Sequence, residues 1–498
     1  MPYDWIIIAL TGIFTHIVRA CNGKGFVMTI AQTLAAMSSV FFWAASVSAA
    51  EHTVRPSIEG DWWTVAHNPD LGAYTSDRQQ PVDFAVWQAA DGTWQLWSCI
   101  RWTKLGGHTR LFHRWEGKSL TDTDWEPKGI AMEADPALGE PLGGLQAPHV
   151  VRWNGLYHMV YGDWEHMCFA TSQDGKEFTR RILPDGTTGV FTEGPGQNTR
   201  DPVLLFTKGK WHMYYTAFPR GKGYNFCRTS TDLREWSDSM VVAYGGRAGN
   251  NPFSCECPHV IETQPGLYHL FRTQMYGENA QTSVYQSRNP YNFGIDDDHY
   301  FVCTLPAAAP EIIFHEGQYY MAALLPSLEG IQIAKLRFLQ EAAVAVFDFD
   351  TPEDRALWQV VEGDVANVFT TSTRSNFFPP MQHFIGTAEL ADDAQAHDEL
   401  TVVIESPEFT VQSGAYNVFV SGGADEDKVY VALMDAATGA MLWKTTGNGS
   451  NNFGKARVDW SEFLGKRVRL RIVDQSKEPW GHINFGGLYA LGIVKTTP

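Results

Sequence analysis

The sequence predicts an all-β protein in which a five-bladed β-propeller is followed by a β-sandwich domain. The first observation is a repeat, since Pro148, Pro202, Pro258 and Pro310 follow one another at intervals of 54, 56 and 52 residues, close to the length of one propeller blade. The second is that short alternating runs bounded by Gly, Asp and Pro are common, whereas little of the chain has helical periodicity. The third is that the repeat stops near residue 340, where alternating segments without it begin.

Each repeat unit has the same internal order. A proline opens an apolar strand, a turn containing Gly follows, and an aromatic strand comes next, over 155–161, 209–215, 266–271 and 317–321. A polar strand and an outer turn complete the unit, as at 171–178 and 229–236. An earlier, degenerate copy begins at Pro81-Val82-Asp83 and continues through 91–97, which makes five units. We therefore assign residues 51–342 to a five-bladed propeller, which segment 56–74 packs on or closes.

The C-terminal part, residues 345–498, is predicted to be a β-sandwich. Segments 416–420, 429–433 and 468–473 alternate strongly between apolar and polar residues, as antiparallel strands covered on one face do. Trp443, Trp460 and Trp480 serve either the core of this domain or a sugar-binding surface. The domain is therefore a candidate carbohydrate-binding module.

Composition narrows the range of ligands. The 498 residues carry a formal net charge of −18, and binding to nucleic acid needs clustered positive charge, so we expect no nucleic-acid partner. A neutral sugar is compatible with an acidic body. The sequence contains no Gly-rich phosphate loop and no His-Glu zinc motif. Cys255 and Cys257 are separated by one residue and lack a second pair at zinc spacing, so we expect neither a metal nor a cofactor.

The first 50 residues have the pattern of an N-terminal targeting segment. Arg19 and Lys24 precede an apolar run from Phe26 to Ala50 that ends in small residues, which is typical of a secretion signal. We expect cleavage after Ala49 or Ala50 and a secreted or periplasmic protein, with no membrane contact beyond this segment. An uncleaved membrane anchor stays open because the apolar region is long.

Three acidic residues, Asp83, Asp201 and Glu256, occupy comparable early positions in their units. The first strand of each blade lines the propeller axis, so these side chains are expected to converge. Two carboxyl groups that face one glycosidic bond can cleave it, one ionised and one protonated. A third can hold sugar hydroxyls and the positive charge that develops at the anomeric carbon.

Other residues are candidates for contact with the substrate, an oligo- or polysaccharide. Trp87, Trp164 and Tyr224 have side chains suited to the faces of a sugar ring. His149 is expected to face the axis, either as a buried histidine or as a substrate ligand. Glu311 follows Pro310 in the fifth unit, where it serves either ring closure or substrate binding.

Two motifs resemble those of glycoside hydrolase family 32, the fructan-cleaving enzymes. Thr199-Arg200-Asp201-Pro202 is similar to the Arg-Asp-Pro motif of that family, and Glu256-Cys257-Pro258 is similar to its Glu-Cys motif. Segments 473–476 and 480–485 look like the ends of sandwich modules appended to such hydrolases. The resemblance covers roughly residues 60–498 and implies a five-bladed propeller followed by a β-sandwich.

Carried over by position, the resemblance implies that Asp83 is the nucleophile, Asp201 the transition-state stabiliser and Glu256 the general acid/base. Arg200 would orient Asp201 and bind a hydroxyl. These roles imply an exported hydrolase of a furanoside, first of all a β-fructoside, that retains the anomeric configuration. Around Asp83, however, the chain reads Gln-Pro-Val-Asp-Phe-Ala where the family has Trp-Met-Asn-Asp-Pro-Asn. Two alternatives therefore stay open: an inverting arabinofuranosidase or xylosidase similar to family 43, and a non-catalytic sugar-binding propeller.

Overall fold

The computed structural model describes residues 53–492 apart from 342, 364–368, 371–380, 382 and 391–394. The predicted targeting segment, residues 1–50, lies outside the described residues. Among the residues that are described, no helix is both long enough and apolar enough to cross a membrane.

Within the range 53–341, the strands form five four-stranded antiparallel sheets. Their strands are β2 (Gln80–Gln88), β3 (Trp94–Arg101), β4 (Leu111–Gly117) and β5 (Glu126–Met132); β6 (Gln146–Trp153), β7 (Leu156–Gly162), β8 (Met167–Ser172) and β9 (Thr179–Arg180); β10 (Arg200–Thr207), β11 (Lys210–Ala217), β12 (Tyr224–Ser230) and β13 (Met240–Tyr244); β14 (Glu256–Gln264), β15 (Leu267–Met275), β16 (Gln281–Ser287) and β17 (Phe301–Leu305); β18 (Glu311–His315), β19 (Gln318–Leu324), β20 (Gly330–Glu341) and β1 (Thr53–His67). The first strands contact one another in the cycle β2–β6–β10–β14–β18–β2. The sheets are therefore the blades of a propeller, and the predicted all-β fold class is confirmed.

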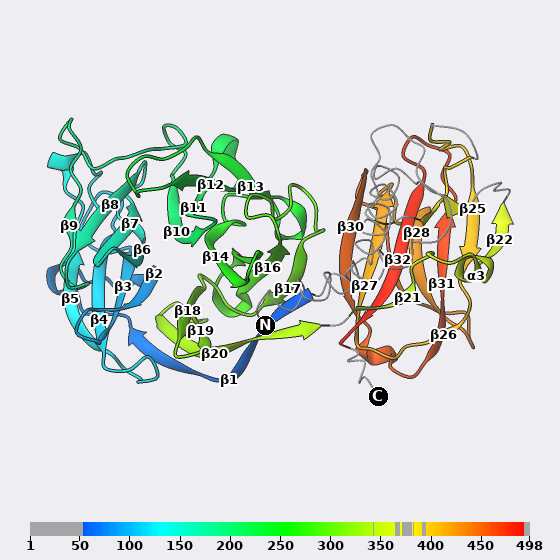
Figure 1. Cartoon of the computed structure of the whole chain (residues 1–498), viewed down its shortest axis with the longest axis horizontal. Helices are drawn as coiled ribbons and strands as arrows, with labels where there is room; N and C mark the ends of the chain where they lie inside the picture. The colour runs from blue at the N-terminus through cyan, green and yellow to red at the C-terminus, as the bar shows by residue number, and fades with distance from the viewer. Residues whose placement is uncertain are drawn as a thin grey trace, which may run out of the picture. The chain divides into compact units, whose positions relative to one another are not determined.

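The ring is closed by the two ends of the propeller sequence. β1 pairs along its length with β20, so the N-terminal strand becomes the outermost strand of the fifth blade. Figure 1 shows the chain passing through the blades in order, with β1 (blue) returning beside β20 (yellow-green). β1 covers the edge that β20 would otherwise expose and joins the two ends of the propeller sequence in one sheet, which agrees with the expected closing role of segment 56–74.

Tight hairpins join the first and second strands of three blades. Asn154-Gly155, Lys208-Gly209 and Glu316-Gly317 each place two successive residues at positive φ, as a two-residue type I′ turn requires. The glycines take this conformation without the steric cost that a Cβ brings. These turns explain why the predicted Gly positions separate the apolar strand from the aromatic strand.

The first strand of each of the first four blades contains one non-glycine residue in the left-handed region at an equivalent place, and in the fifth blade the equivalent residue lies two positions before β18. These residues are Asp83 (φ 36°), Ala147 (41°), Asp201 (56°), Cys257 (46°) and Ala309 (51°). In the first four blades the pairing register shifts at the same point, which identifies a β-bulge that re-aims the side chain. A proline follows the bulge residue in four blades, but Phe84 follows it in the first. The prediction that the first repeat begins at Pro81 is therefore corrected, because Phe84 occupies the proline position.

The described residues from 343 to 492 form two six-stranded sheets that pack face to face. One sheet contains β21 (Ala343–Phe347), β23 (Phe369–Thr370), β24 (Phe384–Gly386), β27 (Ala415–Gly422), β30 (Ser450–Asp459) and β32 (Ile483–Leu491); the other contains β22 (Gln359–Gly363), β25 (Val402–Glu405), β26 (Phe409–Thr410), β28 (Val429–Asp435), β29 (Met441–Thr445) and β31 (Arg467–Asp474). Their inner faces share one apolar core. Trp460 is fully buried in this core, Trp443 packs against it, and Trp480 is 46% exposed. Of the three tryptophans, Trp480 alone presents a large exposed surface to a ligand.

Short helices connect some of these strands. They are α3 (Pro352–Ala356) and the 3-10 helices η1 (Gly72–Tyr74), η2 (Pro136–Leu138), η3 (Pro219–Gly221), η4 (Gly246–Ala248), η5 (Gly277–Asn279) and η6 (Ser461–Phe463).

Candidate active site

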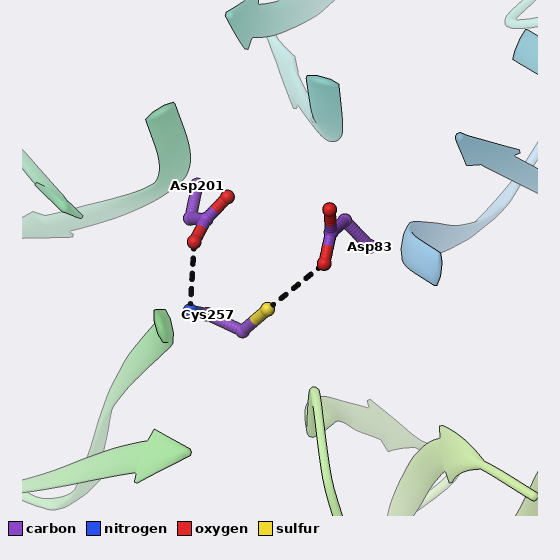
Figure 2. A group of neighbouring side chains, drawn as sticks. All are labelled: Asp83, Asp201 and Cys257. Carbon is purple, nitrogen blue, oxygen red and sulfur yellow. Dashed lines mark hydrogen bonds between the residues drawn. The ribbon is translucent and has the colours of Figure 1, made fainter. Parts of the chain in front are cut away.

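The bulge residues line a pocket on the propeller axis. Its lining residues come from all five first strands and the turns that lead into them: Asp83, Phe84, Ala147, Pro148, Asp201, Pro202, Cys257, Pro258, Ala309 and Glu311. Each of the first four blades contributes its bulge residue and the residue that follows it. The polar side chains at the bulge positions are those of Asp83, Asp201 and Cys257, which point toward one another in Figure 2.

Cys257 connects the two aspartates. Its backbone N–H donates to Asp201 Oδ2 at 3.0 Å, and its thiol donates to Asp83 Oδ1 at 3.3 Å. The thiol has one proton, so the hydroxyl of Tyr276, 3.5 Å from the sulfur, acts as donor to it. The single residue Cys257 therefore sets the positions of both carboxyl groups.

Arg200 connects the remaining carboxyl group to Asp201. Its Nη2 lies 2.5 Å from Glu256 Oε1, and its Nε lies 3.6 Å from Asp201 Oδ2. Glu256 pairs with Thr273 in its blade as Arg200 pairs with Thr216 in the preceding blade. Glu256 thus occupies the position of Arg200, one residue before the bulge. The prediction that all three acids hold comparable positions is corrected for Glu256, which reaches the site from a different point of its strand.

Asp201 is the most perturbed acid of the group. Burial raises the pKa of its carboxyl to about 7, and the negative charges of Asp83 and Glu256 act in the same direction, while Arg200 opposes them. The side chain is 4% exposed, and Oδ1 has no hydrogen-bond partner. An unpaired buried oxygen costs free energy, which a ligand can recover by supplying a hydrogen bond or a positive charge.

Arg110 is a member of the site that the sequence analysis missed. Its Nη1 lies 3.5 Å from Asp83 Oδ2, on the opposite oxygen from Cys257. Its guanidinium lies 5.2 Å from the centre of the Trp164 ring, which stacks on His108 at 3.9 Å. Trp164 therefore lies beside Arg110, which in turn contacts Asp83, and its contact with a sugar ring stays a prediction. No motif marks Arg110, because it lies at the end of a loop that only the fold brings to Asp83.

Glu311 and His149 form a second group with His259. Nδ1 of His149 lies 3.7 Å from Glu311 Oε2, and Nδ1 of His259 lies 3.6 Å from Oε1. Burial acts to raise the pKa of Glu311, but the two histidines outweigh it and the pKa is lowered. Glu311 lines the pocket and His149 does not. His149 is therefore a buried partner of Glu311, and Glu311 is the residue of this group that can meet a ligand.

Two predicted sugar contacts lie elsewhere. Trp87 is buried between blades, where its indole N–H donates to the carbonyl of Gly175 at 2.8 Å, so its prediction as a sugar ligand is corrected. It lies four residues beyond the bulge, where β2 has left the axis. Tyr224 is half-buried, stacks on Tyr244 at 4.3 Å and is not among the residues that line the pocket.

Substitution Trp87→Phe tests this correction. Loss of the N–H···O bond and of part of the ring is expected to lower the free energy of unfolding by about 1–2 kcal/mol and to leave activity unchanged. Urea unfolding and steady-state kinetics measure the two effects. Trp102→Phe, at a tryptophan that is 47% exposed, is the control and should change stability by less than about 0.5 kcal/mol. A fall in kcat/KM without loss of stability would contradict this correction and would indicate that Trp87 contacts the substrate.

Comparison with known proteins gives relatives over part of the chain. A probable sucrose-6-phosphate hydrolase of Vibrio cholerae is 31% identical over 181 residues, which are 35% of this chain and 30% of the relative. A second probable sucrose-6-phosphate hydrolase, from Vibrio cholerae serotype O1, is 24% identical over 197 residues, 34% of each chain. The chain thus spans about a third of the length of the curated relatives it matches. No protein-family profile matches it.

Similar solved structures are also glycoside hydrolases by name. One is a thermostable family-43 glycoside hydrolase, with 14% identity and a TM-score of 0.40 over 55% of this chain and 92% of that one. Another is an α-L-arabinofuranosidase from Clostridium thermocellum, with 12% identity and a TM-score of 0.38 over 53% of this chain and 91% of that one.

Proposed function

We propose that the protein is an exported glycoside hydrolase that cleaves a furanoside, first of all a β-fructoside, with retention of configuration. The observation that carries the proposal is a connected set of three carboxyl groups: Asp83 and Asp201 line the axial pocket and both contact Cys257, and Arg200 contacts Asp201 and Glu256. Asp83 and Glu256, which lie 173 positions apart in the chain, would then act on one bond. The curated relatives add support, since sucrose, the sugar in their name, is itself a β-fructofuranoside.

In this mechanism Asp83 attacks the anomeric carbon and Glu256 protonates the leaving oxygen. Glu256 then takes a proton from water, which attacks the glycosyl-enzyme on the face that the leaving group vacated. Asp83 suits the first role because Cys257 and Arg110 each contact one of its oxygens, which fixes the carboxylate toward the pocket. Near-attack geometry of this kind supplies much of an enzyme's rate.

Asp201 and Glu311 would bind the sugar rather than react with it. The unpaired Oδ1 of Asp201 can bond to a sugar hydroxyl, and the proton that Asp201 holds near neutrality allows it to act as donor as well as acceptor. Glu311 offers a second carboxylate to the pocket. Contacts on both sides of the reacting carbon would keep the ring in place while the positive charge at that carbon develops.

A panel of fructans, arabinans and xylans tests the function of the full chain. We expect hydrolysis of a fructoside, and NMR of the first-formed product should show the anomeric configuration of the substrate. Inversion on an arabinoside or xyloside would instead support the arabinofuranosidase or xylosidase alternative. Binding without turnover on every member of the panel would overturn the proposal and favour a sugar-binding propeller.

A further inference from the structure

We propose that Asp83, Asp201 and Cys257 form a binding site for a thiophilic divalent cation, Zn²⁺ or Cd²⁺. Each residue offers one ligand atom, and these atoms all lie within 4.8 Å of one another. Figure 2 shows the thiol and the two carboxyl groups directed to the same space. The proposal goes beyond hydrolysis and holds whether or not the protein cleaves a glycoside.

The ligand spacing suits tetrahedral coordination. Zinc binds thiolate sulfur at about 2.3 Å and carboxylate oxygen at about 2.0–2.2 Å, which places neighbouring ligand atoms about 3.5 Å apart. The sulfur of Cys257 already lies 3.3 Å from Asp83 Oδ1. The Asp201 ligand atom lies within 4.8 Å of the other two, so it would have to move closer when an ion binds, and the fourth position would be left for water.

The buried oxygen of Asp201 is an independent indication of a ligand. Asp201 is 4% exposed, lines the pocket, and its Oδ1 has no hydrogen-bond partner. A buried polar atom without a partner is destabilised relative to the same atom in water. A cation bound at this oxygen would remove that cost.

The charges around the pocket also favour a cation. When they are ionised, the carboxylates of Asp83, Asp201, Glu256 and Glu311 supply four negative charges, whereas the guanidinium groups of Arg110 and Arg200 supply two positive charges. The thiolate of Cys257 would add one more negative charge on metal binding, and a divalent ion would offset two of the resulting three excess negative charges. The ion replaces the thiol proton, so a metal–sulfur bond forms while the S–H bond breaks and the proton leaves to solvent.

The thiol determines which ions bind. Thiolate ligands select soft or borderline ions such as Cd²⁺ and Zn²⁺, whereas Mg²⁺ and Ca²⁺ prefer ligand sets made only of oxygen. The bound ion would occupy the oxygens of Asp83 and Asp201. If the proposed hydrolase function holds, Zn²⁺ and Cd²⁺ would therefore inhibit competitively with the sugar.

Titration of the full chain with Cd²⁺ tests the site. A cadmium–thiolate bond has a charge-transfer band in the ultraviolet, so the absorbance of this band measures binding. We expect a saturable band at one ion per chain, no band with Ca²⁺ or Mg²⁺, and loss of the band in Cys257→Ser. Cys227→Ser is the matched control, because Cys227 is buried in β12, where its thiol donates to the backbone carbonyl of Arg228 and the side chain packs in an apolar cluster. The control should keep the band.

Asp201→Asn provides a second variant that leaves the thiol in place. It should still give the band but bind Cd²⁺ at least about tenfold more weakly, since one charged ligand is lost. Circular dichroism establishes that each variant is folded. Absence of the band in the unchanged protein, or its persistence in folded Cys257→Ser, would overturn the proposal. The absorbance of the cadmium–thiolate band does not depend on turnover. The metal site and the proposed hydrolase function can therefore fail independently of each other.

Discussion

Substitution Glu256→Gln is expected to lower kcat on a furanoside by about 10²–10⁴-fold, the range that general acid–base catalysis contributes. Glutamine keeps the size of the side chain but has no acidic proton to give to the leaving oxygen. The loss should be smaller for a substrate whose leaving group needs no protonation. Added azide should then accelerate the variant and give a glycosyl azide of retained configuration, because a nucleophile of that kind attacks the glycosyl-enzyme without a general base.

Glu262→Gln is the matched control for this experiment. Glu262 lies on the same strand, β14, but its carboxylate accepts hydrogen bonds from Thr207 and from the backbone of Gly266, whereas Glu256 contacts Arg200, which connects it to Asp201. Its replacement should leave kcat within a few-fold of the unchanged protein. Full turnover in Glu256→Gln, with the fold intact by thermal unfolding, would remove Glu256 as the proton donor.

The contribution of Asp474, in the sandwich, to the stability of the protein should fall as pH rises from about 4 to about 7. This side chain is fully buried, and burial raises the pKa of its carboxyl from 3.8 to about 7, only partly opposed by hydrogen bonds from Thr387 and the backbone of Ser476. Among the residues that the structure describes, its Oδ2 has no hydrogen-bond partner. The folded state therefore keeps a proton that the unfolded chain has already lost. Between these two pKa values stability decreases with pH, and above the higher value the loss is complete.

The size of this effect follows from the interval between the two pKa values. A change from 3.8 to about 7 corresponds to about 4 kcal/mol in the free energy of unfolding. Asp474→Asn should remove this part of the pH dependence, so the variant should gain stability relative to the unchanged protein as pH rises from 4 to 8. Urea unfolding at both pH values measures the difference.

Asp427→Asn is the control for Asp474, because the Asp427 side chain is 95% exposed. It should show the same pH dependence as the unchanged protein. If Asp474→Asn also parallels the unchanged protein between pH 4 and 8, the carboxyl is not protonated in the folded state.

The fold could be predicted from the sequence because the features that mark each repeat are local. A proline after a bulge residue and a glycine in a type I′ turn each restrict the backbone of one or two residues, and they recur wherever a blade begins. The first blade has Phe84 in place of the proline. The sequence alone therefore places its start at Pro81, and the positive φ that Asp83 shares with the four equivalent residues identifies the correct position.

The candidate site was predicted in part. Asp83 and Asp201 could be identified because they occupy equivalent places in their repeats, and Glu256 because it lies in a recognisable motif. Arg110 and Tyr276 carry no comparable signal, since each joins the site from a loop or a strand end. Trp87 was misplaced because an aromatic side chain suits a core and a sugar platform equally well, and composition cannot distinguish them.

The sequence by itself determined the class of fold, the number of repeats and the types of side chain at the head of each first strand, because these depend on backbone preferences of a few adjacent residues. Only the tertiary structure decided which of those side chains meet. Closing the ring brings strands from five distant segments to one axis, and in the first four blades the bulge decides which of two successive residues points there. For that reason Cys257, the residue after Glu256, holds the place that corresponds to Asp83 and Asp201, and its thiol and backbone N–H connect the two acids.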